Sequence, residues 1–97
     1  MIEQLIQNLV KFPTEENKKS YFQFVSEIEY SLLQDSEKLP FKSQEYFDKR
    51  KQAFAYRREC AIMLINSWIA TYGSIEDAPV SYADTLIIPF QKIKKPQ

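Results

Sequence analysis

The stretch from Ser43 to the only glycine, Gly73, constrains the fold of this chain more than any other feature of the sequence. Ser43 suits the N-cap of a helix, and Gly73 suits the residue just beyond the C-terminus of one, so the spacing predicts a single helix over 44–72. At about 1.5 Å per residue this helix is about 43 Å long, longer than the rest of so small a protein needs. A chain of 97 residues has room for one compact domain, so we expect a single helical domain over 1–97.

Two further helices are predicted before residue 40. Apolar residues spaced three and four apart mark an amphipathic helix over about 2–11, and Phe12 before Pro13 ends it. Thr14 then suits an N-cap, and we expect a second helix over about 15–34, followed by a loop over 35–40. The apolar positions of these two helices are Ile2, Leu5, Ile6, Leu9, Val10, Tyr21, Phe24, Val25, Ile28 and Leu32.

The expected fold is therefore all-α, a small bundle of three principal helices (about 2–11, 15–34 and 44–72) with a largely irregular C-terminal arm over about 74–97. Residues 60–70 are apolar on nearly every side, which predicts a central buried helix segment with Trp68 packed between the first two helices. Within the C-terminal arm, Ser74 with Asp77 and Ser81 with Asp84 each have the spacing of a short helical turn.

The apolar stretch 86–93 has three interpretations. It can complete the core as a last layer, which we favour because a small domain needs the area. It can pair as an edge strand with a second copy or a partner, or it can be mobile and end in the lysine-rich tail.

Composition excludes several kinds of chemistry. The chain has no histidine, so the commonest general base and zinc ligand are absent, and a single glycine cannot build a glycine-rich phosphate loop. We predict no metal and no cofactor. Met1 is followed by Ile2, Glu3 and Gln4 without the basic region of a signal peptide, no apolar run reaches membrane-spanning length, and Cys60 has no partner for a disulfide. We therefore expect a cytoplasmic protein that does not cross a membrane.

Two catalytic hypotheses are weak. Cys60 is a nucleophile only if nearby arginines lower the pKa of its thiol, but it opens the most apolar stretch, where a core thiol is expected. A site built from Glu45, Glu59 and Arg57 is chemically conceivable, although no spacing selects these residues. We predict no catalytic residues and no enzyme activity.

A basic ridge over residues 42–58 is the sharpest local feature. Residues 41–58 hold six basic against two acidic residues, although the net charge of the chain is zero. The candidate partner-binding residues of this ridge are Tyr46, Lys49, Arg50, Lys51, Tyr56, Arg57 and Arg58. The alternative, which we favour, is that the cations border the apolar stripe of the helix and reach acids of the second helix, such as Glu27 and Glu29.

By exclusion, the sequence favours a non-enzymatic protein-binding regulator, inhibitor or adaptor, for instance a phage- or plasmid-type accessory protein that blocks a larger machine. The overlong helix and the 14% aromatic content support this interpretation. The alternative is a nucleic-acid-binding regulator that uses the basic ridge, against which stand the neutral net charge and a pI near 6.3. We also expect a homodimer, because two short helices cannot cover the third along its whole length.

Overall fold

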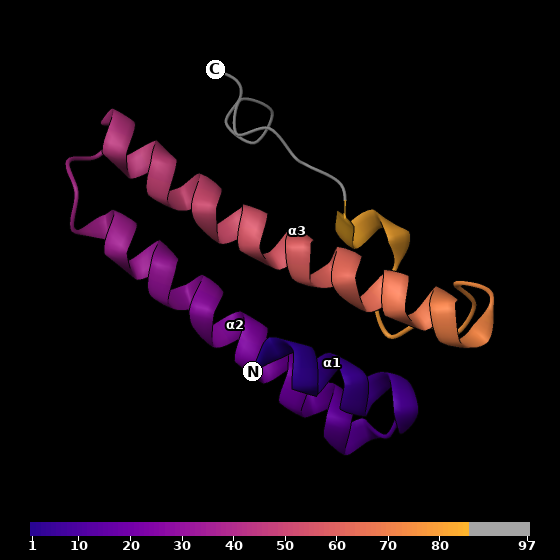
Figure 1. Cartoon of the computed structure of the whole chain (residues 1–97). Coiled ribbons are helices and arrows are strands. Elements are labelled where there is room, and N and C mark those ends of the chain that lie inside the picture. Colours follow the sequence, from indigo (N-terminus) through magenta and orange to yellow (C-terminus); the bar gives the residue numbers. More distant parts are fainter. Residues whose placement is uncertain (86–97) are drawn as a thin grey trace.

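The structure, a computed structural model, describes residues 1–85 and is a small all-α bundle. Three helices, α1 (Ile2–Lys11), α2 (Glu15–Glu37) and α3 (Gln44–Tyr72), are followed by a short 3-10 helix, η1 (Tyr82–Thr85), and no strand occurs among these residues. Figure 1 shows α2 and α3 as a long hairpin with α1 against one end of it. The predicted three-helix fold is confirmed, whereas the three interpretations of residues 86–93 lie outside the described residues.

The helix ends follow from the capping residues. The Thr14 side chain accepts the N–H of Asn17 at 3.1 Å, and the Ser43 side chain accepts the N–H of Tyr46 at 3.2 Å, as N-caps do. Gly73 has a φ of 83°, in the left-handed region that ends helices most easily at glycine. All three capping roles were predicted from the sequence, and they fix the starts of α2 and α3 and the end of α3.

The predicted end of the second helix at residue 34 is wrong by about one turn. Residues 35–37 continue α2 instead of forming a loop, and the Lys38 N–H then bonds to the Asp35 carbonyl at 3.2 Å. Ser36 is fully buried and donates its hydroxyl to the Leu33 carbonyl at 2.6 Å. Because this hydroxyl is satisfied inside the helix, serine does not act here as a terminating residue.

Only one of the two short turns predicted after Gly73 becomes a helix. The Ser81 N–H donates to the Asp84 carboxylate at 2.9 Å, and η1 follows at Tyr82–Thr85. The segment after Ser74 forms a turn instead, in which Asp77 has a φ of 64°. That left-handed conformation is incompatible with continuing a right-handed helix.

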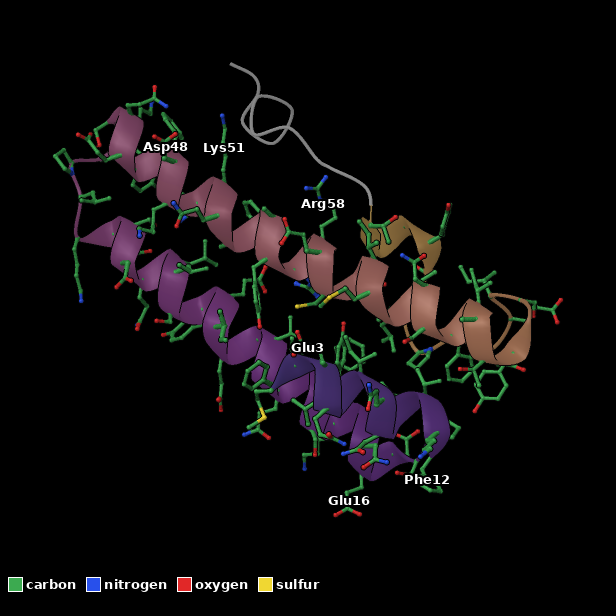
Figure 2. The ribbon with its side chains drawn as sticks, viewed as in Figure 1. Glu3, Phe12, Glu16, Asp48, Lys51 and Arg58 are labelled. Carbon is green, nitrogen blue, oxygen red and sulfur yellow. The ribbon has the colours of Figure 1, made fainter. Side chains whose placement is uncertain are left out.

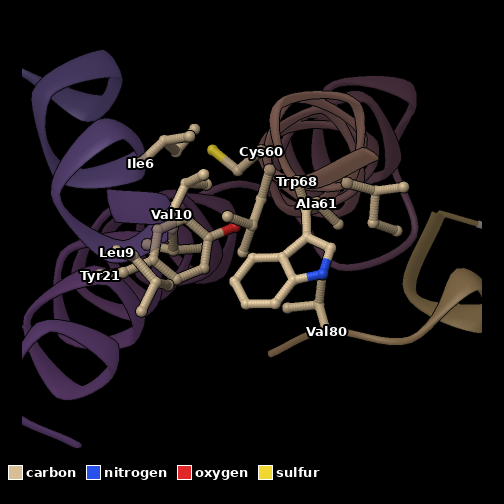
Figure 3. Packing of buried hydrophobic residues seen from close by; sticks show 11 residues of the cluster. Ile6, Leu9, Val10, Tyr21, Cys60, Ala61, Trp68 and Val80 are labelled. Carbon is tan, nitrogen blue, oxygen red and sulfur yellow. The ribbon is translucent and has the colours of Figure 1, made fainter. Parts of the chain in front are cut away.

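The hydrophobic core lies at one end of the hairpin, where α1 and the segment before η1 cover it (Figure 3). From the two long helices it takes residues only between Tyr21 and Val25 and between Cys60 and Trp68. Its buried members are Ile6, Leu9, Val10, Tyr21, Val25, Cys60, Ala61, Leu64, Ile65, Trp68 and Val80. Outside these two ranges, the hairpin contributes only the partly buried Tyr56, which packs against the cluster.

Trp68 ties α3 to the segment that follows it. The indole is 5% exposed, and its N–H donates to the Glu76 carbonyl at 3.1 Å. Figure 3 shows its ring beside Val80. The neighbouring Tyr72 hydroxyl donates to the Val10 carbonyl of α1. Trp68 is thus a core residue as predicted, but it packs against the chain after Gly73 as well as against the helices.

Residues 60–70 are not buried on every side, contrary to the prediction. Ile62, Met63 and Ile69 keep 37%, 37% and 39% of their surface exposed. Periodicity alone overestimated the burial, because α1, α2 and the 75–80 segment together cover only part of the circumference of α3.

We predict that Trp68→Ala lowers the free energy of unfolding by about 3 to 5 kcal/mol, the usual cost of emptying a large buried site. Urea denaturation followed by circular dichroism measures the loss. The control is Tyr82→Ala, which removes an aromatic ring that is 68% exposed and should change stability little. Wild-type stability of the Trp68 variant would contradict its assignment to the core.

Candidate interaction surface

The hairpin continues far beyond the core as a distal arm, defined here as residues 26–58. At about 1.5 Å per residue α1 is about 15 Å long and α3 about 43 Å, so α1 covers only one end of α3. Within the distal arm only Glu29, Ser36 and Ala53 are buried. Tyr56, Ser26 and Arg57 at the base of the arm still meet the core or the segment before η1, whereas the core cluster does not extend farther along the arm.

The seam between the two helices of the arm is polar. The Arg57 guanidinium meets the Glu29 carboxylate at 3.2 Å, and the Arg50 guanidinium donates to the Ser36 hydroxyl at 3.4 Å. The partners lie seven residues apart in each helix, as expected for two helices that meet along one antiparallel seam. The Glu29 side chain is 12% exposed and the Arg57 side chain 57%, so the pair is buried on its acidic side.

Large apolar side chains lie on the surface of the arm. Phe41 is 73% exposed, Tyr30 62% and Phe54 37%. Ile28, Leu32 and Leu33 are half-buried, since only the opposite helix covers them. Other exposed apolar side chains, such as Phe12 and Tyr82, lie outside the arm, but exposed rings of this kind are available for contact with another molecule.

An aromatic tip, made of Phe41, Tyr46 and Phe47 with the cations Lys42 and Arg50, closes the far end of the arm. The rings of Phe41 and Tyr46 meet edge to face at 5.3 Å, and those of Tyr46 and Phe47 at 5.4 Å. Lys42 lies over the Phe41 ring at 5.5 Å and Arg50 over the Tyr46 ring at 5.4 Å. Cation–π contacts of this kind order exposed rings that would otherwise move freely.

The basic ridge is divided between two sides of α3. Arg50 and Arg57 face α2, whereas Figure 2 shows Lys51 and Arg58 on the side away from it. Within residues 1–85, Lys49, Lys51 and Arg58 form no ion pair. The buried Nε of Arg58 also has no hydrogen-bond partner among these residues. Tyr46 belongs to the aromatic tip, and Tyr56 packs against the core.

The predicted contact between the ridge and acids of the second helix is present for one acid. Glu29 receives Arg57, whereas Glu27 accepts from the side chain of Gln23 at 3.2 Å. Sequence spacing placed the arginines correctly on the edge of the stripe. It did not identify Ser36 as the partner of Arg50, because a serine in the interior of a helix carries no recognisable signal.

Cys60 lies in surroundings that suppress its reactivity. The side chain is 1% exposed, and burial raises the pKa of the thiol, so it stays protonated at neutral pH. Burial also raises the pKa of Tyr21 well above its ordinary range and that of Tyr56 to about 12. These groups behave as core side chains, as expected for Cys60.

A cavity of about 20 Å³ between α2, α3 and the segment before η1 is large enough for about one water molecule. Its lining residues are Phe22, Val25, Ser26, Arg57, Ala61, Val80 and Asp84. It is far below the size of a small-molecule site. Within residues 1–85 no three His, Cys, Asp or Glu side chains come together to hold a metal ion.

No helix in the described part of the chain is long and apolar enough to cross a membrane. Comparison with protein-family models, with curated proteins and with solved structures finds no match for this chain.

We predict that Arg50→Glu combined with Arg57→Glu lowers the free energy of unfolding by at least about 2 kcal/mol, because it places a carboxylate beside buried Glu29 and removes two seam contacts. A loss of that size lowers the melting temperature by about 10 °C. Lys49→Glu with Lys51→Glu makes the same change of charge on the same helix outside the seam. Equal melting temperatures for the two double variants would show that the seam contributes no special stability.

A second prediction concerns alkaline pH. Because the pKa values of Tyr21, Tyr56 and Cys60 are raised in the folded protein, the unfolded chain loses protons first, and stability falls as the pH rises above the ordinary thiol and phenol values of about 8.5 and 10. Tyr21→Phe should make this decline shallower. Urea denaturation of both proteins at several pH values between about 8 and 11 measures the two slopes. Parallel slopes would contradict the assignment.

Proposed function

We propose that this protein is a non-enzymatic regulator, inhibitor or adaptor that binds another protein through its distal arm. One observation carries the proposal: the arm extends beyond the core and presents exposed aromatic side chains, among them Phe41 and Tyr30. Burying one such ring in a partner contributes about 1.5 to 3 kcal/mol, and aromatic residues are the commonest anchors of protein interfaces. The arm thus offers both apolar area and ordered side chains to a partner.

The non-enzymatic part of the proposal has separate support. Cys60 is buried and protonated, and the cavity beside Arg57 and Asp84 admits about one water molecule. Glu45 and Glu59, the acids of the catalytic hypothesis, are both exposed and lie fourteen residues apart on α3. At about 1.5 Å per residue that separation is about 21 Å, too far for the two carboxylates to act on one substrate bond.

Nucleic-acid binding is the second candidate, and it is favoured by Lys49, Lys51 and Arg58, which form no ion pair within residues 1–85. Two of the ridge arginines, however, are already engaged with Glu29 and Ser36. Acids lie next to two of the remaining cations in the sequence of α3, Asp48 beside Lys49 and Glu59 beside Arg58. A phosphate backbone binds best to a continuous basic surface, which this helix does not present.

A two-fold homodimer is compatible with the same proposal, since the sides of the arm offer a second copy the uncovered length of α2 and α3. Sedimentation velocity at micromolar concentration tests it. If the protein is a monomer over the whole concentration range, the dimer is contradicted, whereas the proposed binding of another protein is not.

The decisive experiment compares two double variants in capture from a lysate of the native host. Tyr30→Ser with Phe41→Ser removes the two most exposed aromatic rings of the arm, and capture of the partner should fall at least about tenfold. The matched control is Phe12→Ser with Tyr82→Ser, which removes rings that are 61% and 68% exposed outside the arm. All four rings are exposed, so both variants should melt like the wild type.

A partner that both double variants capture equally would contradict the role of the arm. Nuclease treatment and a salt series separate the second candidate: capture through nucleic acid would disappear with nuclease and weaken by orders of magnitude between about 50 and 200 mM salt. An aromatic contact with protein should persist under both treatments.

A further inference from the structure

Phe41 is the most exposed large apolar residue of the described chain apart from the terminal Met1. It lies in the link between α2 and α3, in a tight turn in which the Ser43 N–H bonds to the Pro40 carbonyl at 3.0 Å. The next residue, Lys42, has a φ of 67°, a left-handed conformation that is rare for residues other than glycine. Strained backbone conformations cluster at functional sites, so the conformation of Lys42 points to the neighbouring exposed ring as a binding residue.

The ring also has contacts within its own chain before any partner is bound. Its edge-to-face contact with Tyr46 at 5.3 Å and the Lys42 ammonium over its face at 5.5 Å hold it at the end of the arm. An anchor that is already ordered loses little side-chain entropy on binding, which makes it more effective than a flexible one.

The charges around the tip select the chemistry of a partner. Lys42, in the turn before α3, lies over the Phe41 ring, and Arg50 on α3 lies over the Tyr46 ring, so each of these two rings has a cation beside it. Asp48 lies on the opposite side of α3, two residues from Tyr46, and accepts from the Gln44 side chain at 2.8 Å. Lys42 has no ion pair within residues 1–85, so a carboxylate is the complementary group.

From this geometry we infer that Phe41 inserts into an apolar pocket of a partner protein whose rim carries a carboxylate opposite Lys42. The inference rests on the proposed function and specifies its partner. Nucleobases fit the tip less well, because its rings meet edge to face instead of forming one flat platform, and a cation already lies over one face of Phe41 and of Tyr46.

The test places a benzophenone photo-cross-linking side chain at position 41, and separately at positions 30 and 12, in the full chain within the native host. Phe12 is the matched control, a phenylalanine in a link between helices that is 61% exposed. We expect a protein cross-linked from position 41 but not from position 12. Mass spectrometry of the cross-linked peptide should identify apolar residues of the partner with Asp or Glu nearby.

The purified partner then gives the affinities. Phe41→Ala should raise the Kd about thirtyfold, as for an interface anchor, whereas Phe12→Ala should leave it unchanged. Lys42→Met should raise the Kd about threefold to tenfold and reduce its salt dependence, which a merely structural role of Lys42 would not do. Melting curves of the three variants should match the wild type, because both phenylalanines and Lys42 are exposed.

The outcomes separate this inference from the proposed function. A protein cross-linked from position 30 but not from position 41, or a Phe41→Ala variant of unchanged affinity, overturns the role of the tip and leaves the arm as a binding surface. Cross-links from position 41 to nucleic acid, to lipid or to a second copy of this chain overturn the stated partner. If neither position 30 nor position 41 yields a cross-linked protein, the result overturns both this inference and the proposed function.

Discussion

The packing of Trp68 and its neighbours determines how the rest of this protein is arranged. The indole is buried between α3 and the turn that carries Glu76 and Val80, while Tyr72 on the next turn of the helix reaches the backbone of α1. These contacts place both covering segments at the same end of α3. Because the covering segments are short, the core ends near Cys60, and the remaining length of the hairpin has to be stabilised by other means.

Beyond Cys60 the two long helices are joined by polar contacts. A seam that contains Glu29, Ser36 and two arginines contributes less apolar burial than the same length of hydrophobic seam would. In return it directs the apolar side chains of the arm outward or leaves them half-covered. Apolar burial is therefore concentrated at one end of the molecule.

Local features of the sequence predicted the helices well, and the features that depend on tertiary contacts were less accessible. Thr14, Ser43 and Gly73 act through neighbouring backbone groups, so their roles were visible in the sequence alone. Burial of Ser36 depends on which side of α2 meets α3, and the exposure of Ile62 depends on which side of α3 the other described segments cover. The surroundings of Phe41 follow from the turn before Ser43, which was not predicted from the sequence.

The left-handed residues Lys42 and Asp77 also have a consequence for the unfolded chain. Both occupy backbone conformations in which glycine would be free of strain, yet the chain has a single glycine, at Gly73. Each non-glycine residue in this region costs the folded protein about 1 to 2 kcal/mol. It also narrows the range of conformations available before folding, because a side chain restricts the backbone where glycine does not. In both turns the folded backbone is slightly strained, but the chain loses less conformational entropy on folding than it would with glycine at these positions.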